Sequence, residues 1–251
     1  MELGVRNDCI AGESLEEKMN EIKDMGYDFL ELALKEKEIE SLSEEDINKY
    51  CSLSDRVNFP IKQTSMGHFS LFTDKSKKER KTIISHIKKM VDLTESLEGD
   101  IILLASKEES ENVDSFAEIY KEELKEAADY AEQKNIQLAL EGVGYYKLSL
   151  IDKLVRTINH PAVGMYYDIG NCIYGQEDPV KQLNKSVDIM IALHIKGTKE
   201  IPLAQMPLKK IIRIINNSNY QGRGCLEIAP VSDDTNFHLL KAIKLLKKIG
   251  Y

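Results

Sequence analysis

Short apolar segments alternate along the chain with longer segments in which apolar residues recur at steps of three or four positions. The short segments have the length and composition of β-strands, and the longer ones have the periodicity of amphipathic helices. Within residues 115–133, for example, Tyr120, Leu124 and Ala128 follow one another at helical spacing. A strand-then-helix alternation of this kind predicts a parallel sheet that is covered by helices.

Eight such units can be counted, and this number predicts an α/β fold of the (β/α)₈ TIM-barrel type. The expected strands are Leu3–Arg6, Phe29–Leu32, Ile61–Met66, Ile101–Ala105, Ile136–Glu141, Val163–Asp168, Ile191–Ile195 and Cys225–Ile228. The chain has 251 residues, the usual size of such a barrel, which commonly stays undivided at this length. We therefore expect a single barrel domain over residues 1–251.

The composition narrows the range of partners. Hydrophobic residues make up 42% of the chain and charged residues 30%, as in a soluble globular protein. No apolar run approaches the roughly 20 residues that a membrane-spanning helix needs, so we expect no membrane association. The formal net charge of −8 repels the phosphate backbone of DNA and RNA, which makes nucleic acid an unfavourable partner.

The N-terminus and the cysteines bear on the compartment. Residues 1–6 lack the basic segment and long apolar stretch of a secretory signal, and we expect a cytoplasmic protein. Cys9, Cys51, Cys172 and Cys225 are widely scattered without a CxxC pair. We therefore expect reduced thiols and neither a disulfide framework nor a cysteine zinc site.

Four consecutive expected strands end in a polar residue that can bind a metal. These residues are Glu141, Asp168, His194 and Glu227. In barrels of this type the active site lies at the carboxyl ends of the strands, where the loops that follow them meet. The four side chains are therefore candidates for one shared site, although each taken alone could be an ordinary polar strand-end residue.

The alternation of side chains along the strands predicts which way these residues point. Leu138 and Leu140 share the face that must meet the helices, so Glu141 turns into the barrel mouth. The same parity turns His194 inward together with Ala192. We therefore expect the polar residues of the four strands to converge.

Three carboxylates in a partly dry cavity would repel one another unless a cation or bound protons neutralised them. A divalent metal ion resolves this conflict. The donor set has two Glu, one Asp and one imidazole, and it contains no thiolate. Such a set suits Mn²⁺, Mg²⁺ or Co²⁺ better than structural zinc, while Zn²⁺ remains compatible with it.

With these residues the chain resembles the xylose-isomerase-like TIM barrel superfamily, in particular its sugar (phosphate) isomerase/epimerase family. The resemblance extends over essentially the whole chain and rests on the order and spacing of several short motifs. They are Leu138-Ala139-Leu140-Glu141-Gly142, Tyr167-Asp168-Ile169-Gly170-Asn171, Leu193-His194-Ile195-Lys196 and Tyr220-Gln221-Gly222 followed by Leu226-Glu227.

The resemblance implies that Glu141, Asp168, His194 and Glu227 hold one divalent metal ion and that the two glutamates act as acid and base. The implied activity is that of a sugar isomerase or epimerase, either a ketose 3-epimerase or an aldose–ketose isomerase. Proton transfer would pass through a cis-enediolate, because a metal on the carbonyl and its neighbouring hydroxyl acidifies the intervening C–H. The implied partner is a small sugar or sugar phosphate.

Two positions depart from the family pattern. Asn171 stands where members commonly have a histidine, and it can hydrogen-bond a substrate hydroxyl but cannot shuttle a proton near neutrality. Gly197 stands where many members have an acidic residue that could support the metal-binding histidine. These departures leave the substrate open, and with it the level of activity.

Further residues near the expected mouth are candidates for substrate binding. His68 resembles the family's mouth histidine in the loop after the third strand, and Lys196 can balance an enediolate or hold a phosphate. Acidic residues at 233–234, at the start of the last helix, oppose an anion there, which favours an unphosphorylated sugar. Arg6 and Glu31 could bind substrate or form an ion pair inside the barrel.

Three other functions fit parts of the same pattern. A dehydratase or lyase could use the same metal site and expel a β-hydroxyl. A metal-dependent apurinic endonuclease shares the barrel and the ligand order, but it generally has more histidines than His68 and His194 provide. A catalytically silent barrel that binds a sugar or a protein is motivated by Asn171 and Gly197. A homo-oligomer is compatible with the family, in which dimers and tetramers are common.

Overall fold

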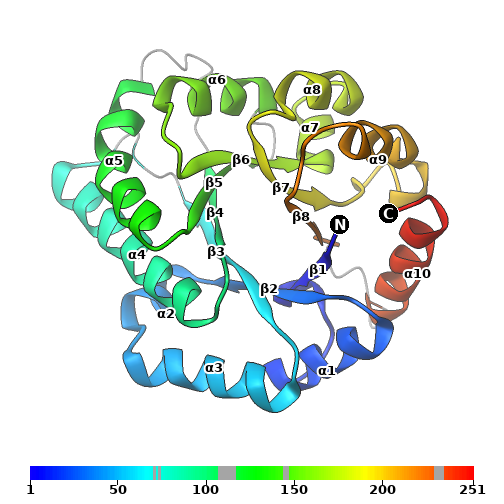
Figure 1. Cartoon of the computed structure of the whole chain (residues 1–251), viewed down its shortest axis with the longest axis horizontal. Coiled ribbons are helices and arrows are strands. Elements are labelled where there is room, and N and C mark those ends of the chain that lie inside the picture. Colours follow the sequence, from blue (N-terminus) through cyan, green and yellow to red (C-terminus); the bar gives the residue numbers. More distant parts are fainter. Residues whose placement is uncertain (70–71, 73–74, 107–116, 144–146, 229–234) are drawn as a thin grey trace.

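Eight parallel strands form a closed barrel in which each strand pairs with its neighbour in sequence and β8 pairs with β1 (Figure 1). The computed structural model describes residues 1–69, 72, 75–106, 117–143, 147–228 and 235–251 of the chain, without the side chains of residues 67–69. The predicted (β/α)₈ fold class is confirmed. The strands are β1 Leu3–Arg6, β2 Phe29–Leu34, β3 Ile61–Phe69, β4 Ile101–Ser106, β5 Gln137–Gly142, β6 Val163–Asp168, β7 Met190–Ile195 and β8 Arg223–Leu226.

Helices surround the barrel on its outside (Figure 1). Several begin with a serine whose side chain accepts a hydrogen bond from the first turn, as Ser14 does in α1 and Ser76 in α4. The start expected near residue 115 lies outside the described residues. The helices are α1 Leu15–Met25, α2 Glu36–Ser41, α3 Glu44–Val57, α4 Lys77–Ser96, α5 Ala117–Gln133, α6 Leu148–Ile158, α7 Ile169–Tyr174, α8 Pro179–Ser186, α9 Leu208–Asn216 and α10 Thr235–Lys248, with short 3₁₀ turns η1 Asn7–Cys9 and η3 Leu203–Gln205.

The buried apolar side chains form two clusters. One lies between the sheet and the helices and contains Leu138 and Leu140 together with helix residues such as Leu124. The other lies inside the barrel and contains Ala139 and Ala192. The predicted parity is therefore correct, because the residues that share a face with Glu141 and His194 are the ones inside.

The bounds of six strands, β2, β3, β4, β5, β7 and β8, differ from the prediction, and the differences in β8 and β3 involve candidate site residues or their neighbours. The eighth strand runs from Arg223 to Leu226 and not from Cys225 to Ile228. It begins earlier because Gly224 pairs with both Leu3 and Leu193, although Arg223 and Gly224 have no apolar side chains to mark a strand. The third strand extends beyond Met66 to Phe69, so that His68 lies in the strand and not in a following loop.

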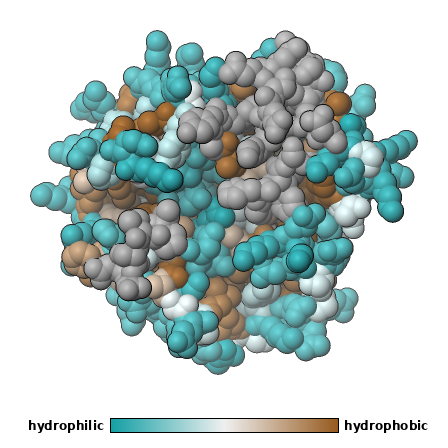
Figure 2. Space-filling view, turned by 180° about the vertical axis from the view of Figure 1, so that it is seen from behind, coloured by the Kyte–Doolittle hydropathy of each residue, from teal (hydrophilic) through white to brown (hydrophobic). Residues whose placement is uncertain are grey.

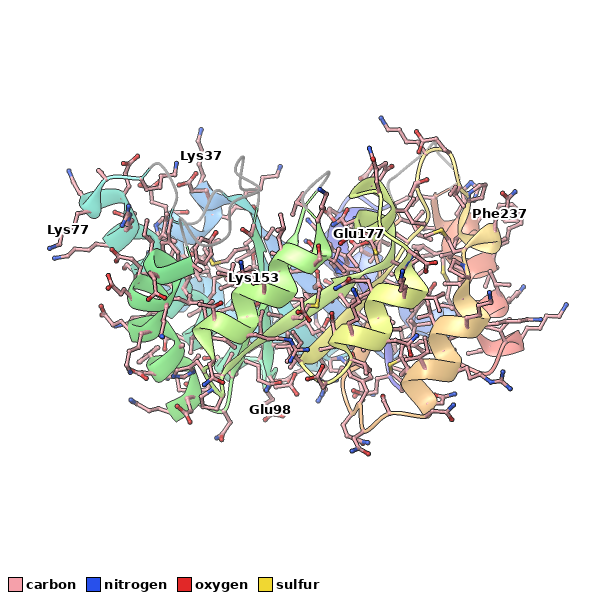
Figure 3. All side chains as sticks on the ribbon, turned by 90° about the horizontal axis from the view of Figure 1, so that it is seen from above. Lys37, Lys77, Glu98, Lys153, Glu177 and Phe237 are labelled. Atoms are coloured by element: carbon pink, nitrogen blue, oxygen red, sulfur yellow. The ribbon has the colours of Figure 1, made fainter. Side chains whose placement is uncertain are left out.

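The carboxyl ends of the strands all open on one side of the barrel. In Figure 3, Lys37 and Lys77, which follow β2 and β3, lie on one side of the barrel. Glu98, which precedes β4, lies on the other side. Figure 2 views the molecule from the side of the carboxyl ends, where hydrophilic residues dominate the rim and apolar surface is broken into small areas. Among the described helices, none combines the length and the apolar character needed to cross a membrane.

Candidate metal centre

The four residues proposed from the strand ends lie together in the barrel mouth. Glu141 is the penultimate residue of β5, Asp168 is the last of β6, His194 is the penultimate residue of β7, and Glu227 directly follows β8. One ligand atom from each lies within 4.8 Å of the others. The closed sheet produces this arrangement, since neighbouring strands place Asp168 directly beside His194 in the register.

The imidazole of His194 lies among the three carboxylates. Its Nδ1 is 2.8 Å from Glu141 Oε1, 3.3 Å from Glu227 Oε2 and 3.8 Å from Asp168 Oδ2. His194, Glu141 and Asp168 are buried, whereas the Glu227 side chain is 18% exposed. The cluster is therefore largely shielded from water, and solvent reaches it on the side of Glu227.

Asp168 and Glu227 each have one oxygen held from outside the cluster. Asp168 Oδ1 accepts a hydrogen bond of 2.8 Å from the backbone N–H of Asn171 and thereby caps α7. Glu227 Oε1 accepts a bond of 2.8 Å from the Arg6 guanidinium. These partners fix the two carboxylates so that Asp168 Oδ2 and Glu227 Oε2 face inward.

The ammonium of Lys196 contacts both of these inward oxygens. Lys196 Nζ is 2.7 Å from Asp168 Oδ2 and 2.7 Å from Glu227 Oε2. Its side chain is only 16% exposed. The residue was predicted to contact substrate, and the structure adds that it is paired with two of the candidate ligands.

Glu31 lies beneath the cluster on β2. Its side chain is fully buried, and Oε1 is 3.3 Å from Nε2 of His194. The hydroxyl of Tyr166 donates to the other oxygen, Oε2, over 2.7 Å. Glu31 therefore contacts the Nε2 edge of the imidazole, whereas the other three carboxylates lie near Nδ1. The sequence did not assign this role, although an inward-facing glutamate in an apolar strand was a usable signal.

Burial and the mutual charges shift the pKa values of the cluster. Burial opposes protonation of His194, but Glu31, Glu141 and Glu227 outweigh it and raise its pKa well above the usual value. Burial also opposes ionisation of Glu141, but the charge of His194 and the hydrogen bond to it lower the pKa. Burial raises the pKa of Asp168 to about 7 despite the nearby Lys196.

Glu227 behaves differently from Asp168, although both contact Lys196. Burial opposes the ionisation of Glu227, but the positive charges of Lys196, His194 and Arg6 outweigh it and hold its pKa far below the usual value. A buried carboxyl that titrates near neutrality thus lies beside one that is firmly ionised. Such separation of pKa values between neighbouring acids is typical of sites that transfer protons.

The remaining predicted residues are placed as follows. The side chain of Asn171 is buried and donates its amide to the Gly142 carbonyl over 2.9 Å. Arg6 forms its ion pairs with Glu227 and Asp8, so the pair with Glu31 that the sequence left open is not made. The side chain of His68 and the acidic residues 233–234 lie outside the described residues.

Gly197 has a structural reason for lacking a side chain. A Cβ at this position would lie 2.7 Å from the backbone oxygen of Ile201 and 2.7 Å from the backbone nitrogen of Leu203. Contacts this short with backbone atoms cannot be relieved by a side-chain movement. An acidic residue therefore does not fit here, and Glu31 supports the opposite side of His194 instead.

Other candidate sites in the described parts of the chain are weaker. Asp129, Glu132 and His160 form a surface group, but Nδ1 of His160 accepts a hydrogen bond from Ala162, which leaves Nε2 as the protonated nitrogen that faces Asp129. A metal at Nε2 would require that proton to move. The group is therefore better explained as a hydrogen bond from His160 Nε2 to Asp129.

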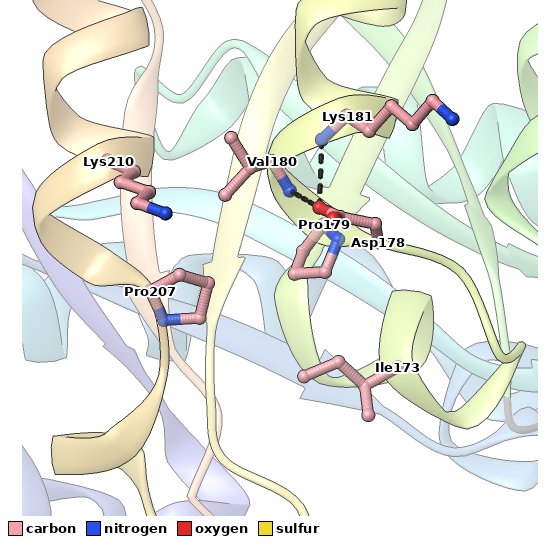
Figure 4. Close-up of a pocket in the computed structure, with 7 residues that line it drawn as sticks. All are labelled: Ile173, Asp178, Pro179, Val180, Lys181, Pro207 and Lys210. Carbon is pink, nitrogen blue, oxygen red and sulfur yellow. Dashed lines mark hydrogen bonds between the residues drawn. The ribbon is translucent and has the colours of Figure 1, made fainter.

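A groove of about 440 Å³ lies beside the start of α8, outside the four-residue cluster (Figure 4). Asp178 lies at its edge and accepts hydrogen bonds from the backbone N–H groups of Val180 and Lys181. These groups would otherwise attract an anion to the helix start, so Asp178 already satisfies them. The groove carries no chemistry comparable to that of the barrel mouth.

The cluster of Glu141, Asp168, His194 and Glu227 fits a divalent metal ion. It offers carboxylate oxygens and one imidazole nitrogen, which are the donors that such ions take. Asp168 Oδ2 is buried and is paired with the Lys196 ammonium at 2.7 Å, so this oxygen already faces a cation. A buried carboxylate oxygen of this kind costs free energy unless a cation or a donor satisfies it.

The sequence of the chain matches one family model and is similar to curated proteins. A family model described as xylose isomerase-like TIM barrel matches residues 19–249. A curated relative, L-ribulose-5-phosphate 3-epimerase UlaE of Salmonella typhi, is 25% identical over 119 residues. This match covers 43% of the chain and 42% of that relative, so the chain spans less than half the length of the relative.

Two solved structures resemble the whole chain. D-allulose 3-epimerase from Methylomonas sp. has a TM-score of 0.82 at 16% identity, covering 99% of this chain and 98% of that one. The IOLI protein, solved with a binding zinc atom, has a TM-score of 0.74 at 16% identity, covering 99% of this chain and 96% of that one. At these identities the similarity shows the shared barrel fold.

Proposed function

Because the chain belongs to the xylose isomerase-like TIM barrel family, we propose that it is a metal-dependent sugar isomerase or epimerase, with residues 1–251 forming one such domain. The observation that carries the proposal is the convergence of Glu141, Asp168, His194 and Glu227 within 4.8 Å at the barrel mouth. The named activities of the similar proteins, UlaE and the Methylomonas enzyme, agree with 3-epimerisation of a ketose.

The charge balance of the mouth supports a divalent ion. Four carboxylates, from Glu31, Glu141, Asp168 and Glu227, surround His194, and two cations, Arg6 and Lys196, pair with them. Metal binding requires ionised carboxylates and a neutral imidazole. In that state the four carboxylates and the two cations leave two negative charges. A divalent metal ion neutralises this excess, which would otherwise be costly in a shielded site.

Glu141, Asp168, His194 and Glu227 would hold the ion, with Mn²⁺, Mg²⁺ or Co²⁺ favoured by the oxygen-rich donor set and Zn²⁺ also compatible. When bound, it would polarise the carbonyl and adjacent hydroxyl oxygens of the sugar and so make the C–H between them more acidic. The zinc atom of the structurally similar IOLI protein is consistent with a metal in this fold.

Proton transfer is assigned to the two glutamates. Glu141 and Glu227 come from β5 and the end of β8, so they stand at the two ends of the four-residue arc. A sugar over the arc would have one carboxylate on each side. One of them removes the proton from carbon and the other returns a proton. Return to the opposite face of the same carbon gives the epimer, and return to the neighbouring carbon gives the isomer.

The substrate is a small sugar or sugar phosphate, bound by polar groups around the arc. Asn171 donates its amide to Gly142, and none of the described residues donates to its Oδ1, which can accept a hydrogen bond from a sugar hydroxyl. His68 and Lys196 remain candidates for substrate contact. A sugar with several hydroxyls is the class of ligand that such a polar, partly buried mouth can hold.

The supporting role of Glu31 leads to a prediction about metal affinity. Replacing Glu31 with glutamine removes the charge that faces Nε2 of His194 at 3.3 Å while keeping the shape of the side chain. We expect a roughly 10- to 100-fold loss in affinity for Mn²⁺, measured by isothermal titration calorimetry, because such partners orient the ligand and raise its basicity. Tyr166→Phe keeps the carboxylate and is expected to cost less. Unchanged affinity in Glu31→Gln would contradict the role.

Solvent exchange at carbon tests the proposed reaction. The chain is incubated with a panel of ketoses and Mn²⁺ in D₂O, and deuterium at the carbon beside the carbonyl is measured by NMR. We expect incorporation into at least one sugar and its loss after treatment with a chelator. An epimer of the starting ketose would identify an epimerase, an aldose would identify an isomerase, and the loss of water would identify a dehydratase. The absence of exchange in every sugar, in protein that binds Mn²⁺, would sink the proposal.

A further inference from the structure

Lys196 holds the two carboxylate oxygens that a metal ion would need. Asp168 and Glu227 each have one oxygen engaged elsewhere, by the Asn171 N–H and by Arg6. Their remaining oxygens, Oδ2 and Oε2, both lie 2.7 Å from Lys196 Nζ. The same two oxygens face Nδ1 of His194 and so belong to the inner surface of the cluster. The ammonium and a metal ion are thus directed to the same atoms.

We infer that Lys196 is a built-in competitor for the metal ion, which weakens metal binding and is displaced from Asp168 and Glu227 when the metal enters. This inference rests on the proposed metal site and adds a regulatory element to it. Binding of the metal must replace two ion pairs that are already made. The site would therefore need a higher concentration of free metal for the same occupancy than it would without Lys196.

The position of the Lys196 side chain depends on the neighbouring residue Gly170. Its stem runs over Gly170, where a Cβ would lie 2.6 Å from Lys196 Cγ and 3.0 Å from Lys196 Cε. Gly170 directly follows the first residue of α7, which Asp168 caps, so the passage for the stem lies beside one of the two carboxylates. The lack of a side chain at residue 170 therefore allows the ammonium to reach the cluster.

Electrostatics makes it unfavourable for the ammonium and the metal to keep the same oxygens. A divalent ion binds carboxylate oxygen at roughly 2.0–2.2 Å. An ammonium that stays 2.7 Å from the same oxygen would then lie within about 5 Å of the metal. Repulsion between a single and a double positive charge at this separation is large in a shielded site. Either the ammonium withdraws or the metal is held less tightly, and both reduce affinity.

The variant Lys196→Met tests this inference through metal binding alone. Methionine retains an unbranched stem of similar size but removes the charge, so the excess of negative charge at the cluster increases. We expect the affinity for Mn²⁺, measured by calorimetry on the full chain, to become at least about tenfold tighter. Lys196→Gln repeats the comparison with a second neutral side chain in case the methionine variant does not fold.

Lys199→Met is the matched control. Lys199 lies three residues further along the same loop, and its side chain is exposed. Its replacement removes the same charge without touching the cluster, and we expect the Mn²⁺ affinity to stay within about twofold of the unmodified chain, because exposed charges are screened. Tighter binding confined to the Lys196 variants supports competition.

Two other outcomes would overturn the inference, and they differ in what they say about the proposed function. If Lys196→Met binds Mn²⁺ no more tightly than the unmodified chain, Lys196 does not compete, and the metal site stands without it. If neither the unmodified chain nor any Lys196 variant binds Mn²⁺, the metal site itself is wrong and the inference fails with it.

Discussion

Replacing Glu141 or Glu227 with glutamine is expected to lower the rate of solvent exchange into the substrate by roughly 10²- to 10⁴-fold, the usual contribution of a positioned acid or base. Glutamine keeps the size of each side chain but cannot accept a proton from carbon. Because Glu141 and Glu227 are both proposed metal ligands, metal binding should weaken as well. The fold should persist, since the apolar core lies elsewhere.

The measurement is deuterium incorporation at saturating Mn²⁺, so that weaker metal binding does not mimic the loss of a proton-transfer group. Unfolding curves from circular dichroism report whether each variant is folded. Glu122→Gln, on the exposed side of α5, removes one acidic charge far from the mouth and should leave exchange unchanged. Near-normal turnover in both Glu141→Gln and Glu227→Gln would refute the assigned roles.

The barrel and the convergence of its ligands could be predicted from sequence because both follow from simple periodicity. Leu138 and Leu140 alternate with Ala139 and Glu141, and only one of these two sets can meet the helices. The carboxyl ends of parallel strands meet at one rim, so four polar strand ends in a row had to come together. No long-range side-chain detail was needed for either step.

The ion pairs of the mouth could not be predicted in the same way. Arg6 stands opposite Glu31 in the register of β1 and β2, yet its guanidinium pairs with Glu227 across the closure of the barrel. The long Arg6 side chain starts on β1, between β2 and β8, and can reach a carboxylate on either side. The choice depends on where the carboxylates end, and Glu31 is already directed to His194.

Lys196 illustrates a second limit of sequence reasoning. The loop after β7 suggested a group that reaches substrate, but the path of the stem depends on the missing Cβ of Gly170, which comes from another strand-helix unit. Contacts of this kind join residues that are far apart in sequence and show no periodicity. The boundary of β8 has a similar cause, because pairing with both neighbours extends the strand over Arg223 and Gly224.

The departures at Asn171 and Gly197 have different meanings once the structure is considered. Gly197 is required by close backbone contacts and leaves support of His194 to Glu31. Asn171 is part of the site, since its backbone N–H fixes Asp168 and its side chain contacts the end of β5. Gly197 therefore does not weaken the proposed metal site. Asn171, in contrast, is expected to affect how the substrate is recognised.

Changing Asp168 to asparagine is expected to remove metal binding and solvent exchange while leaving the barrel intact. Asparagine is as good a helix cap as aspartate, so the bond from the Asn171 N–H to Oδ1 can be kept. The inward atom, however, loses its negative charge, and the excess charge available to a divalent ion falls from two to one. The loss should exceed the roughly 10- to 100-fold effect of groups that only orient a ligand.

Asp178→Asn is the matched control for this last variant, because Asp178 caps α8 in the same way but lies exposed and away from the cluster. It should bind Mn²⁺ as the unmodified chain does in calorimetry. If Asp168→Asn also kept its affinity, the metal would have to bind without Asp168, and the deeper group of Glu31, His194 and Cys225 would become the alternative. The comparison thus separates the charge at the inward oxygen from the helix cap that the same side chain provides.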